Sequence, residues 1–188
     1  MGSRGLPEVP GLSRARERMM GGMSRSRPAP GVRQQGPLLL VCSSGGHLLQ
    51  LVGLAEAFSA FPRLWVTFDK PDARALLADE RVLHAFGPTN RNIPNLLRNL
   101  RLAFSVLRRE RPRAIVSTGA GVAVPFAWLG RLMGIPVVYI ESVTRITSLS
   151  LSGRMIKPVA SEVFVQWPEL AETVRGARYE GSSLATAA

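Results

Sequence analysis

One stretch near the start of the chain decides the fold: Leu38-Leu39-Leu40-Val41-Cys42-Ser43-Ser44-Gly45-Gly46-His47-Leu48-Leu49-Gln50. An apolar run of strand length passes through two glycines into a helical apolar pattern. Backbone N–H groups at a helix N-terminus are unpaired and lie at the positive end of the helix dipole, so they suit an anion such as phosphate. Gly45 and Gly46 allow a ligand to approach closely, and His47 adds a titratable group at the same point. The run matches neither a GxGxxG dinucleotide fingerprint nor a Walker loop, and a plain strand-to-helix turn capped by the histidine stays an alternative.

From Leu38 onward, short apolar runs of strand length alternate with helical patterns. The strand-like runs are 38–42, 64–68, 82–86, 114–117, 136–140 and 162–166. The helical patterns are 47–60, 72–79, 93–110, 121–133 and 149–158. This alternation indicates a parallel sheet covered on both faces, and right-handed crossovers then give a doubly wound, Rossmann-like domain. We therefore predict an α/β fold with one such domain, whose ligands bind at the carboxyl ends of the strands.

Length and composition indicate one folded domain with a basic extension. The 188 residues, 46% of them hydrophobic, are enough for one packed core and too few for two full domains of this type. The formal charge is +11, with 22 Arg against 2 Lys. We place the folded domain at 37–188 and interpret residues 1–36, rich in Arg, Gly and Pro, as a disordered tail. This segment has two interpretations. The true start codon is one of the downstream methionines of the tail, or the basic tail touches anionic lipid.

The segment 122–140 is apolar enough to raise the question of a membrane span. Pro125 and Gly134 interrupt it, and a helix followed by a buried strand explains the pattern better. We predict no transmembrane helix. Residues 1–36 contain no apolar segment typical of a secretory signal, and a single cysteine, Cys42, excludes an internal disulfide, which fits the cytosol.

Polar groups follow three further strands at the edge where such a fold binds its ligand. The loop Ser117-Thr118-Gly119-Ala120-Gly121 is a second glycine-flanked helix start. Glu141 directly follows the next strand, where a carboxylate is costly unless it is solvated, paired or used. It is a candidate general base or acceptor for sugar hydroxyls, and a salt bridge to Arg145 is its alternative role. The polar residues after the strand at 82–86 are Thr89, Asn90, Arg91 and Asn92.

Residues 91–113 form a basic segment in which Glu110 is the only acid. One face of the predicted helix carries Arg98, Arg101 and Arg108, and another carries leucines and a phenylalanine. Such a helix suits an anionic membrane surface, and an ordinary covering helix with solvated arginines is the alternative. Nucleic-acid binding is not indicated, because no recognised nucleic-acid module is present.

Four motifs, taken together, carry a family resemblance. They are Cys42-Ser43-Ser44-Gly45-Gly46-His47, Ser117-Thr118-Gly119-Ala120-Gly121-Val122-Ala123-Val124-Pro125, Gly134-Ile135-Pro136-Val137-Val138-Tyr139-Ile140-Glu141-Ser142 and Phe164-Val165-Gln166-Trp167-Pro168. In this order the pattern resembles the PssD/EpsE/CpsF-type polysaccharide-biosynthesis glycosyltransferase subunits. It also resembles the membrane-anchoring subunit of the eukaryotic two-subunit N-acetylglucosaminyltransferase that extends dolichol-diphosphate-GlcNAc. More distantly, it is similar to the N-terminal half of the peptidoglycan glycosyltransferase that adds GlcNAc to a lipid-diphosphate acceptor.

The resemblance implies a domain equivalent to the N-terminal half of a GT-B glycosyltransferase, which holds the acceptor while the other half binds the nucleotide-sugar. It implies an acceptor-binding subunit that presents a polyprenyl-diphosphate-sugar to a partner with the UDP-sugar site, at the cytoplasmic face of a membrane. His47 or Glu141 is then the expected catalytic base. The residues expected to bind the acceptor and its diphosphate are Ser44, Gly45, Gly46, Asn90, Arg91, Thr118, Gly119, Gly121 and Arg145. Neither a metal nor another cofactor is implied.

The chain departs from the eukaryotic subunit at its start, where that subunit has a membrane-spanning helix and this chain has the Arg-rich tail. We therefore expect peripheral attachment to an anionic membrane surface. Val165, Trp167 and Leu170 are candidates to dock the partner, and packing within the chain is the alternative for Trp167. Two other classes of function stay open: a self-sufficient small nucleotide-sugar transferase, and a non-catalytic recruiter of a partner enzyme to the membrane.

Overall fold

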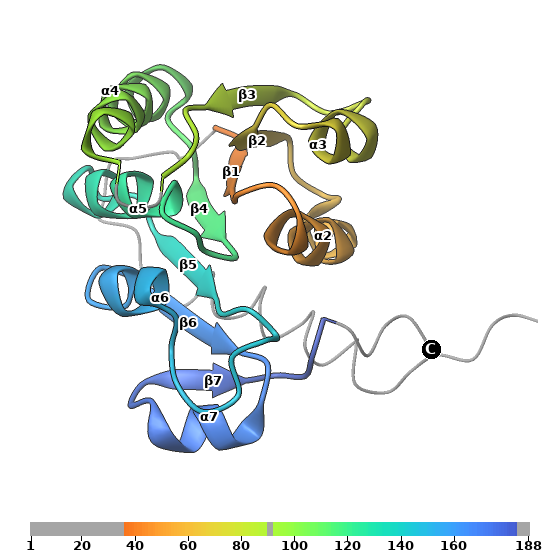
Figure 1. Ribbon diagram of the computed structural model, residues 1–188, viewed down its shortest axis with the longest axis vertical. Helices are drawn as coiled ribbons and strands as arrows, with labels where there is room; N and C mark the ends of the chain where they lie inside the picture. Colours follow the sequence, from red (N-terminus) through yellow and green to blue (C-terminus); the bar gives the residue numbers. More distant parts are fainter. Residues whose placement is uncertain (1–35, 90–91, 184–188) are drawn as a thin grey trace, which may run out of the picture. The chain divides into compact units, whose positions relative to one another are not determined.

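A parallel sheet of seven strands forms the centre of the computed structural model, which describes residues 36–89 and 92–183. The strands lie in the order β3-β2-β1-β4-β5-β6-β7 (Figure 1). Their bounds are β1 Leu38–Val41, β2 Arg63–Phe68, β3 Val82–Ala85, β4 Ala114–Ser117, β5 Val137–Ile140, β6 Glu162–Val165 and β7 Ala177–Tyr179. The chain runs outward from β1 to β3, returns to β4 beside β1, and then runs outward on the other side. Ligands of such folds bind at the carboxyl ends of the strands where the winding reverses, here at β1 and β4.

Helices cover both faces of the sheet. In Figure 1, α2 and α3 lie on one side of it, and α4, α5 and α6 lie on the other. The helices are α2 Gly46–Gly53, the 3-10 helix η1 Ala55–Phe58, α3 Pro71–Leu76, α4 Ile93–Glu110, α5 Ala123–Leu132, α6 Leu151–Ile156 and α7 Pro168–Thr173. The predicted doubly wound α/β fold is confirmed, because every predicted strand and helix is present with its ends shifted by a few residues.

The sequence did not predict α7 and β7. These elements have six and three residues, too few for a helical period or a strand alternation to be recognised. The predicted helix at 47–60 is divided, since α2 ends at Gly53 and the 3-10 helix follows. The segment 122–140 forms α5 and β5, as the interrupted apolar pattern predicts.

The central strands are apolar because helices exclude water from both faces of the sheet. All four residues of β1 are 0% exposed, and those of β4 and β5 are buried as well. Burying one such aliphatic side chain contributes about 1.5–3 kcal/mol. The packed strands therefore fix the starting points of the loops that follow β1, β4 and β5.

Helix α4 buries two amide side chains together with apolar residues and exposes Leu96, Leu97 and Leu100. Its buried residues are Asn95, Asn99, Ala103, Val106 and Leu107. The Asn99 side chain accepts a hydrogen bond from the Phe86 N–H at 2.9 Å and donates one to the Phe86 carbonyl oxygen at 2.8 Å. We call the exposed apolar row that flanks this buried face the outer stripe; its residues, 40% to 69% exposed, are Ile93, Leu96, Leu97, Leu100 and Phe104. The amides thus bind the segment after β3, and an apolar surface is left outside.

The candidate partner anchors near the C-terminal end belong to the core of the chain itself. Val165 is 2% exposed and Leu170 0% exposed, in a cluster with Leu149 against which Trp167 packs. The Trp167 indole N–H donates a hydrogen bond to the Val143 carbonyl oxygen at 2.6 Å. The prediction that Val165 and Leu170 anchor a partner is therefore wrong, because α7 folds back over this part of the sheet.

None of the helices within residues 36–89 and 92–183 is long and apolar enough to cross a membrane. Residues 1–35 lie outside the described residues. The interpretation of 1–36 as a disordered tail therefore stays a prediction.

Candidate functional site

The two predicted glycine loops meet at the carboxyl ends of β1 and β4. Nδ1 of His47 lies 2.7 Å from the Thr118 carbonyl oxygen, and the Thr118 hydroxyl donates a hydrogen bond to the His47 carbonyl oxygen at 2.8 Å. The register of the sheet explains this contact, because Val41 pairs with Ser117 and the loops leave from adjacent points. The topology thus brings together two residues that are 71 positions apart in the sequence.

The contact with Thr118 fixes the protonation pattern of the His47 ring. A carbonyl oxygen can only accept a hydrogen bond, so Nδ1 must carry a proton. In the neutral ring Nε2 then has a free lone pair. The half-buried His47 side chain can therefore take up a proton at Nε2 while Thr118 holds its orientation.

Gly119 packs the second glycine loop against its neighbours. Its φ of 108° lies in the region that favours glycine. A Cβ at this position would lie 3.1 Å from the Tyr139 hydroxyl, 3.3 Å from the Ser152 hydroxyl and 3.5 Å from Cε1 of His47. These three side chains therefore surround the Gly119 backbone, and a larger residue there would collide with them.

Glu141 is buried and accepts four hydrogen bonds. Oε1 accepts from the Tyr139 hydroxyl at 3.0 Å and from the Ser142 N–H at 2.9 Å. Oε2 accepts from the N–H and the hydroxyl of Ser150 at 2.8 and 3.1 Å. Arg145 is exposed, and within the described part of the chain the carboxylate is bonded to hydroxyls and amides, not to this guanidinium. These donors take the place of the salt bridge considered from the sequence, and they offset the cost of burying a charge.

The carboxylate of Glu141 holds the start of α6. Ser150 caps this helix, and its hydroxyl accepts a hydrogen bond from the Gly153 N–H at 3.0 Å. A Cβ at Gly153 would collide with Oε2 of Glu141 and with the Tyr139 hydroxyl, so the close approach requires glycine. The Ser150 hydroxyl also lies 3.1 Å from the Ser152 hydroxyl. A polar network therefore runs from the buried Glu141 carboxylate through the Ser150 hydroxyl to the Ser152 hydroxyl beside the second glycine loop.

Burial keeps two acidic groups at these strand ends protonated. It raises the pKa of the Tyr139 hydroxyl well above its ordinary range, and the negative charge of Glu141 raises this pKa further. It raises the pKa of the Cys42 thiol to about 12. Tyr139 is therefore a permanent hydrogen-bond donor to Glu141, and Cys42 is a neutral, 0% exposed side chain rather than a nucleophile.

The first glycine loop is held by α3. The Gly45 N–H donates a hydrogen bond to the Asp72 carboxylate at 2.6 Å, and the φ of Gly45 is 75°. The amides of Gly46 and His47, in the first turn of α2, have no acceptor within the helix. These two amides, rather than that of Gly45, are the donors that the loop offers to an anion.

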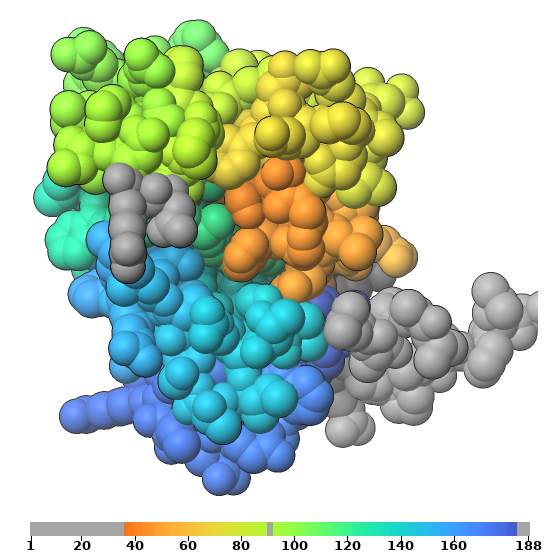
Figure 2. Space-filling model, in the orientation of Figure 1, coloured from red at the N-terminus to blue at the C-terminus, as the bar shows by residue number. Residues whose placement is uncertain are grey.

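Helix α2 is also tied to the loop after β5. The buried Gln50 side chain donates a hydrogen bond to the Ser142 hydroxyl and accepts one from the Val143 N–H, both at 3.3 Å. In Figure 2 the orange surface of α2 lies beside the cyan surface of the loop after β5. The two glycine loops and the loop after β5 therefore form one continuous wall, which we call the loop wall.

The other predicted site residues differ in their burial and in their distance from the glycine loops. A Cβ at Gly121 would lie 3.0 Å from the Thr89 hydroxyl, so the segment after β3 reaches the second glycine loop. Ser44 is half-buried and Arg145 is exposed. Outside the described residues lie Asn90 and Arg91.

The groups of the loop wall suit phosphate and sugar oxygens. Backbone amides, the half-buried Ser152 hydroxyl beside the second glycine loop and the His47 ring can form hydrogen bonds to such oxygens. Among the described residues no group of three or more His, Cys, Asp or Glu side chains could hold a metal ion. The arrangement can therefore bind an anionic, hydroxyl-bearing ligand through the protein's own donors and can accept a proton from it.

Sequence reasoning missed Tyr139, Ser150 and Ser152. Tyr139 lies in a strand that reads as a continuous apolar run, which hides its hydroxyl. The two serines read as an ordinary helix start. One signal in the sequence could have found the serines. Their helix start follows soon after Glu141, and the free amides at a helix N-terminus stabilise a nearby carboxylate.

Comparison with known proteins identifies the family. Residues 88–183 match the family described as "Oligosaccharide biosynthesis protein Alg14 like". The UDP-N-acetylglucosamine transferase subunit ALG14 of Rattus norvegicus is 30% identical over 191 residues, covering 84% of this chain and 87% of that protein. The chain belongs to the Alg14 family. Membership confirms the resemblance to the anchoring subunit of the eukaryotic two-subunit transferase.

A second relative of this Alg14-family chain matches over a shorter span. The subunit of the same name from Eremothecium gossypii is 41% identical over 92 residues, which cover 43% of this chain and 41% of that protein. That match spans less than half of either chain.

Solved structures resemble the Alg14-family chain in fold. MurG of Acinetobacter baumannii superposes with a TM-score of 0.62 at 18% identity, over 76% of this chain and 45% of MurG. A UDP-N-acetylglucosamine 2-epimerase from Rickettsia bellii superposes with a TM-score of 0.59 at 14% identity, over 80% of this chain and 46% of the epimerase. The chain thus corresponds to less than half of each structure, in line with the predicted equivalence to one half of a GT-B protein.

Proposed function

We propose that this Alg14-family chain is the acceptor-binding, membrane-associating subunit of a heteromeric glycosyltransferase. The enzyme transfers a sugar from a UDP-sugar to a polyprenyl-diphosphate-linked sugar. The names of the relatives, which describe subunits of a UDP-N-acetylglucosamine transferase, support both the reaction class and the need for a partner. The observation that carries the proposal is the His47 ring, whose Nδ1 is occupied by the Thr118 carbonyl oxygen at 2.7 Å.

In the proposed reaction His47 is the general base. Its Nε2 accepts the proton of the attacking acceptor hydroxyl while that oxygen bonds to the anomeric carbon of the donor sugar. The bond between this carbon and UDP breaks, and UDP leaves with the electron pair. The hydrogen bond to Thr118 stabilises the imidazolium form and keeps Nε2 directed. A positioned base of this kind typically contributes about 10²–10⁴-fold in rate.

The diphosphate of the acceptor is proposed to lie on the two glycine loops. The free amides of Gly46 and His47 at the positive end of α2 supply donors, and the open space beside Gly46 allows close approach. Gly119 and Gly121 are the proposed contacts from the second glycine loop. The proposed contacts that extend this cradle are Ser44, Gly45, Asn90, Arg91 and Arg145, whereas Thr118, which is 0% exposed, acts through its hydrogen bonds to His47.

Of the two candidate bases, the geometry favours His47 over Glu141. The Glu141 side chain is 0% exposed and its oxygens already accept four hydrogen bonds, so an acceptor hydroxyl cannot reach it without breaking them. We assign Glu141 the role of a positioning residue, which acts through Ser150 and Ser152 on the space beside Gly119.

Membrane attachment is proposed to use the face that α4, α5 and α6 cover. The outer stripe of α4 continues with exposed apolar residues on the adjacent helices, Trp128 at 44%, Leu132 at 78% and Leu151 at 73%. Large exposed apolar patches mark sites of interaction with membranes or proteins. Arg101 and Arg108 on the same helix add positive charge, which suits anionic lipid headgroups. Attachment is then peripheral, at the cytoplasmic face of the membrane.

Reconstitution with the cognate partner subunit tests the proposal, since the partner is proposed to supply the UDP-sugar site. The variant H47Q should lower the transfer rate by about 10²-fold or more if His47 is the base. The matched control is H84Q, because His84 is the other histidine of the chain and lies exposed on β3. The control should stay within about twofold of the wild type.

Three outcomes distinguish the proposal from its alternatives. A near-normal rate for H47Q would place the base in the partner and reject the role of His47. Robust transfer by the isolated chain would favour a self-sufficient transferase. A non-catalytic recruiter would be favoured if the complexes with H47Q and with E141Q were both fully active. In that case the partner would lose its membrane binding only when this chain is omitted.

A further inference from the structure

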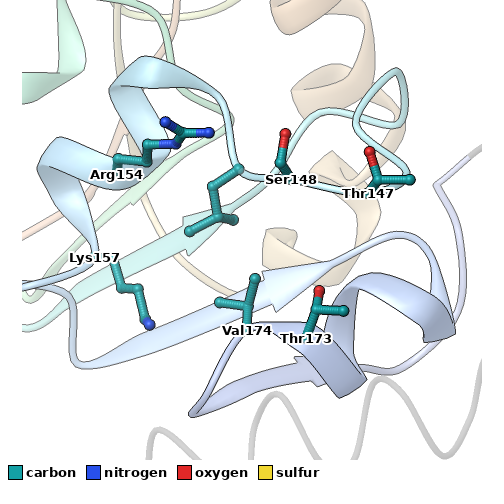
Figure 3. Close-up of a pocket in the computed structure, with 7 residues that line it drawn as sticks. Thr147, Ser148, Arg154, Lys157, Thr173 and Val174 are labelled. Carbon is teal, nitrogen blue, oxygen red and sulfur yellow. The ribbon is translucent and has the colours of Figure 1, made fainter.

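A groove of about 380 Å³ lies between α6 and α7. Figure 3 shows Arg154 of α6 and Lys157, the residue after this helix, along one side and Thr173 and Val174 along the other. The loop before α6 closes one end; the lining residues it supplies are Thr147, Ser148 and Leu149. The groove therefore combines two cations and three hydroxyls over an apolar floor.

The charges of the groove are not balanced by carboxylates. None of the described residues that line it is acidic. Within the described ranges, no ion pair is formed by Arg154 or Lys157. Lys157 is half-buried and Arg154 is exposed, so both cations are accessible to an anion that enters the groove.

We propose that the groove between α6 and α7 binds a phosphate group. The lining residues supply a guanidinium, an ammonium group and three hydroxyls, all of which can donate hydrogen bonds to the acceptor oxygens of a phosphate. The lining of the groove includes none of the residues proposed to bind the acceptor, although the loop after β5 contributes to both the groove and the loop wall. The alternative to a binding site is that Arg154 and Lys157 only stabilise the C-terminal end of α6 through the helix dipole.

The surroundings allow two sources for this phosphate. Leu151 and Met155, which are 73% and 45% exposed, lie on the outer side of α6 next to the groove. The Trp128 indole N–H donates a hydrogen bond to the Met155 carbonyl oxygen at 3.0 Å, which joins α6 to the apolar surface of α5. A headgroup at the edge of a bilayer could therefore reach the groove, and so could free phosphate from solution.

The lysine content of the chain provides a direct test. Lys70 and Lys157 are its only lysines, so amine-selective acetylation followed by mass spectrometry reports on the groove and on one exposed reference site. In a phosphate-free buffer, added inorganic phosphate should slow acetylation of Lys157 by several-fold and leave Lys70 unchanged. Chloride at equal ionic strength should protect neither residue.

Substitution of Arg154 checks that protection arises from binding in the groove. R154Q should weaken the phosphate dependence of Lys157 protection by about tenfold, since it removes a charged hydrogen-bond donor. R74Q, a change of an exposed arginine on α3, should leave it unchanged. Equal melting temperatures of the two variants would show that the fold is intact.

Vesicles separate the two sources of phosphate. Protection of Lys157 by vesicles of phosphatidylglycerol and phosphatidylcholine, lost in R154Q, assigns the site to a lipid headgroup. Protection by inorganic phosphate alone assigns it to a soluble phosphate. Protection that is the same in R154Q and the wild type, or the same at Lys70 and Lys157, or absent with every probe, would overturn the proposal.

Discussion

Replacing Glu141 with alanine should destabilise the domain strongly. The carboxylate is 0% exposed and accepts hydrogen bonds from Tyr139, Ser142 and Ser150. Each hydrogen bond to a charged group contributes about 1.5–3 kcal/mol, but burying the carboxylate itself costs several kcal/mol, so the net effect is smaller than the sum. Breaking such a buried polar set lowers the free energy of unfolding by about 3–5 kcal/mol. For a chain of this size, each kcal/mol shifts the melting temperature by about 2–4 °C, so E141A should melt about 6–20 °C lower.

Thermal unfolding followed by circular dichroism measures this shift. The matched control is E162A, because Glu162 lies on the neighbouring strand and forms a partly exposed ion pair with Arg178 at 3.3 Å. Such a pair contributes about 1 kcal/mol or less. E141Q, which keeps the shape and one acceptor oxygen, should fall between the two variants. A melting temperature for E141A no lower than that of E162A would refute the role assigned to the buried carboxylate.

Three further changes probe other parts of the structure. Asn99→Ala should lower the free energy of unfolding in urea by about 2–3 kcal/mol, because it leaves the Phe86 N–H and carbonyl oxygen without partners. Burial raises the pKa of the Cys42 thiol from 9.0 to about 12, so between these pH values the unfolded chain loses this proton and the folded chain keeps it. The contribution of Cys42 to the free energy of unfolding should therefore be complete below pH 9 and should fall by up to about 1.4 kcal/mol per pH unit between pH 9 and 12. Changing three leucines of the outer stripe to glutamine should weaken sedimentation with anionic vesicles by about tenfold or more, since each buried apolar side chain contributes about 1.5–3 kcal/mol.

Each of these predictions has a control on the same molecule. Ser105→Ala, an exposed change on α4, should leave the urea midpoint unchanged where Asn99→Ala lowers it. Cys42→Ala should flatten the alkaline loss of stability, and an equally steep loss would assign it to other groups. L49Q/L76Q alters exposed leucines on the opposite face of the sheet and should not affect vesicle binding. Equal losses for both leucine sets would contradict a membrane face on α4.

Helix α4 shows where pattern reasoning stops. The periodicity predicts its bounds, 93–110, and the separation of arginines from leucines. It does not predict that Leu96, Leu97 and Leu100 face solvent, because the rule that apolar residues turn inward would bury them. In the tertiary structure Asn95 and Asn99 lie inside together with Leu107, and the two amides bind the backbone of the segment after β3.

The sequence by itself determined the order of strands and helices, the two glycine loops and the presence of His47 at a helix start. These features are local, because a few neighbouring residues set the strand alternation, the helical period and the turns. Only the tertiary structure decided that Nδ1 of His47 meets the Thr118 carbonyl oxygen and that Glu141 is enclosed by Tyr139 and Ser150. Those contacts depend on which strands lie side by side and on how closely α6 approaches β5. Packing of distant segments sets both, and no local pattern records it.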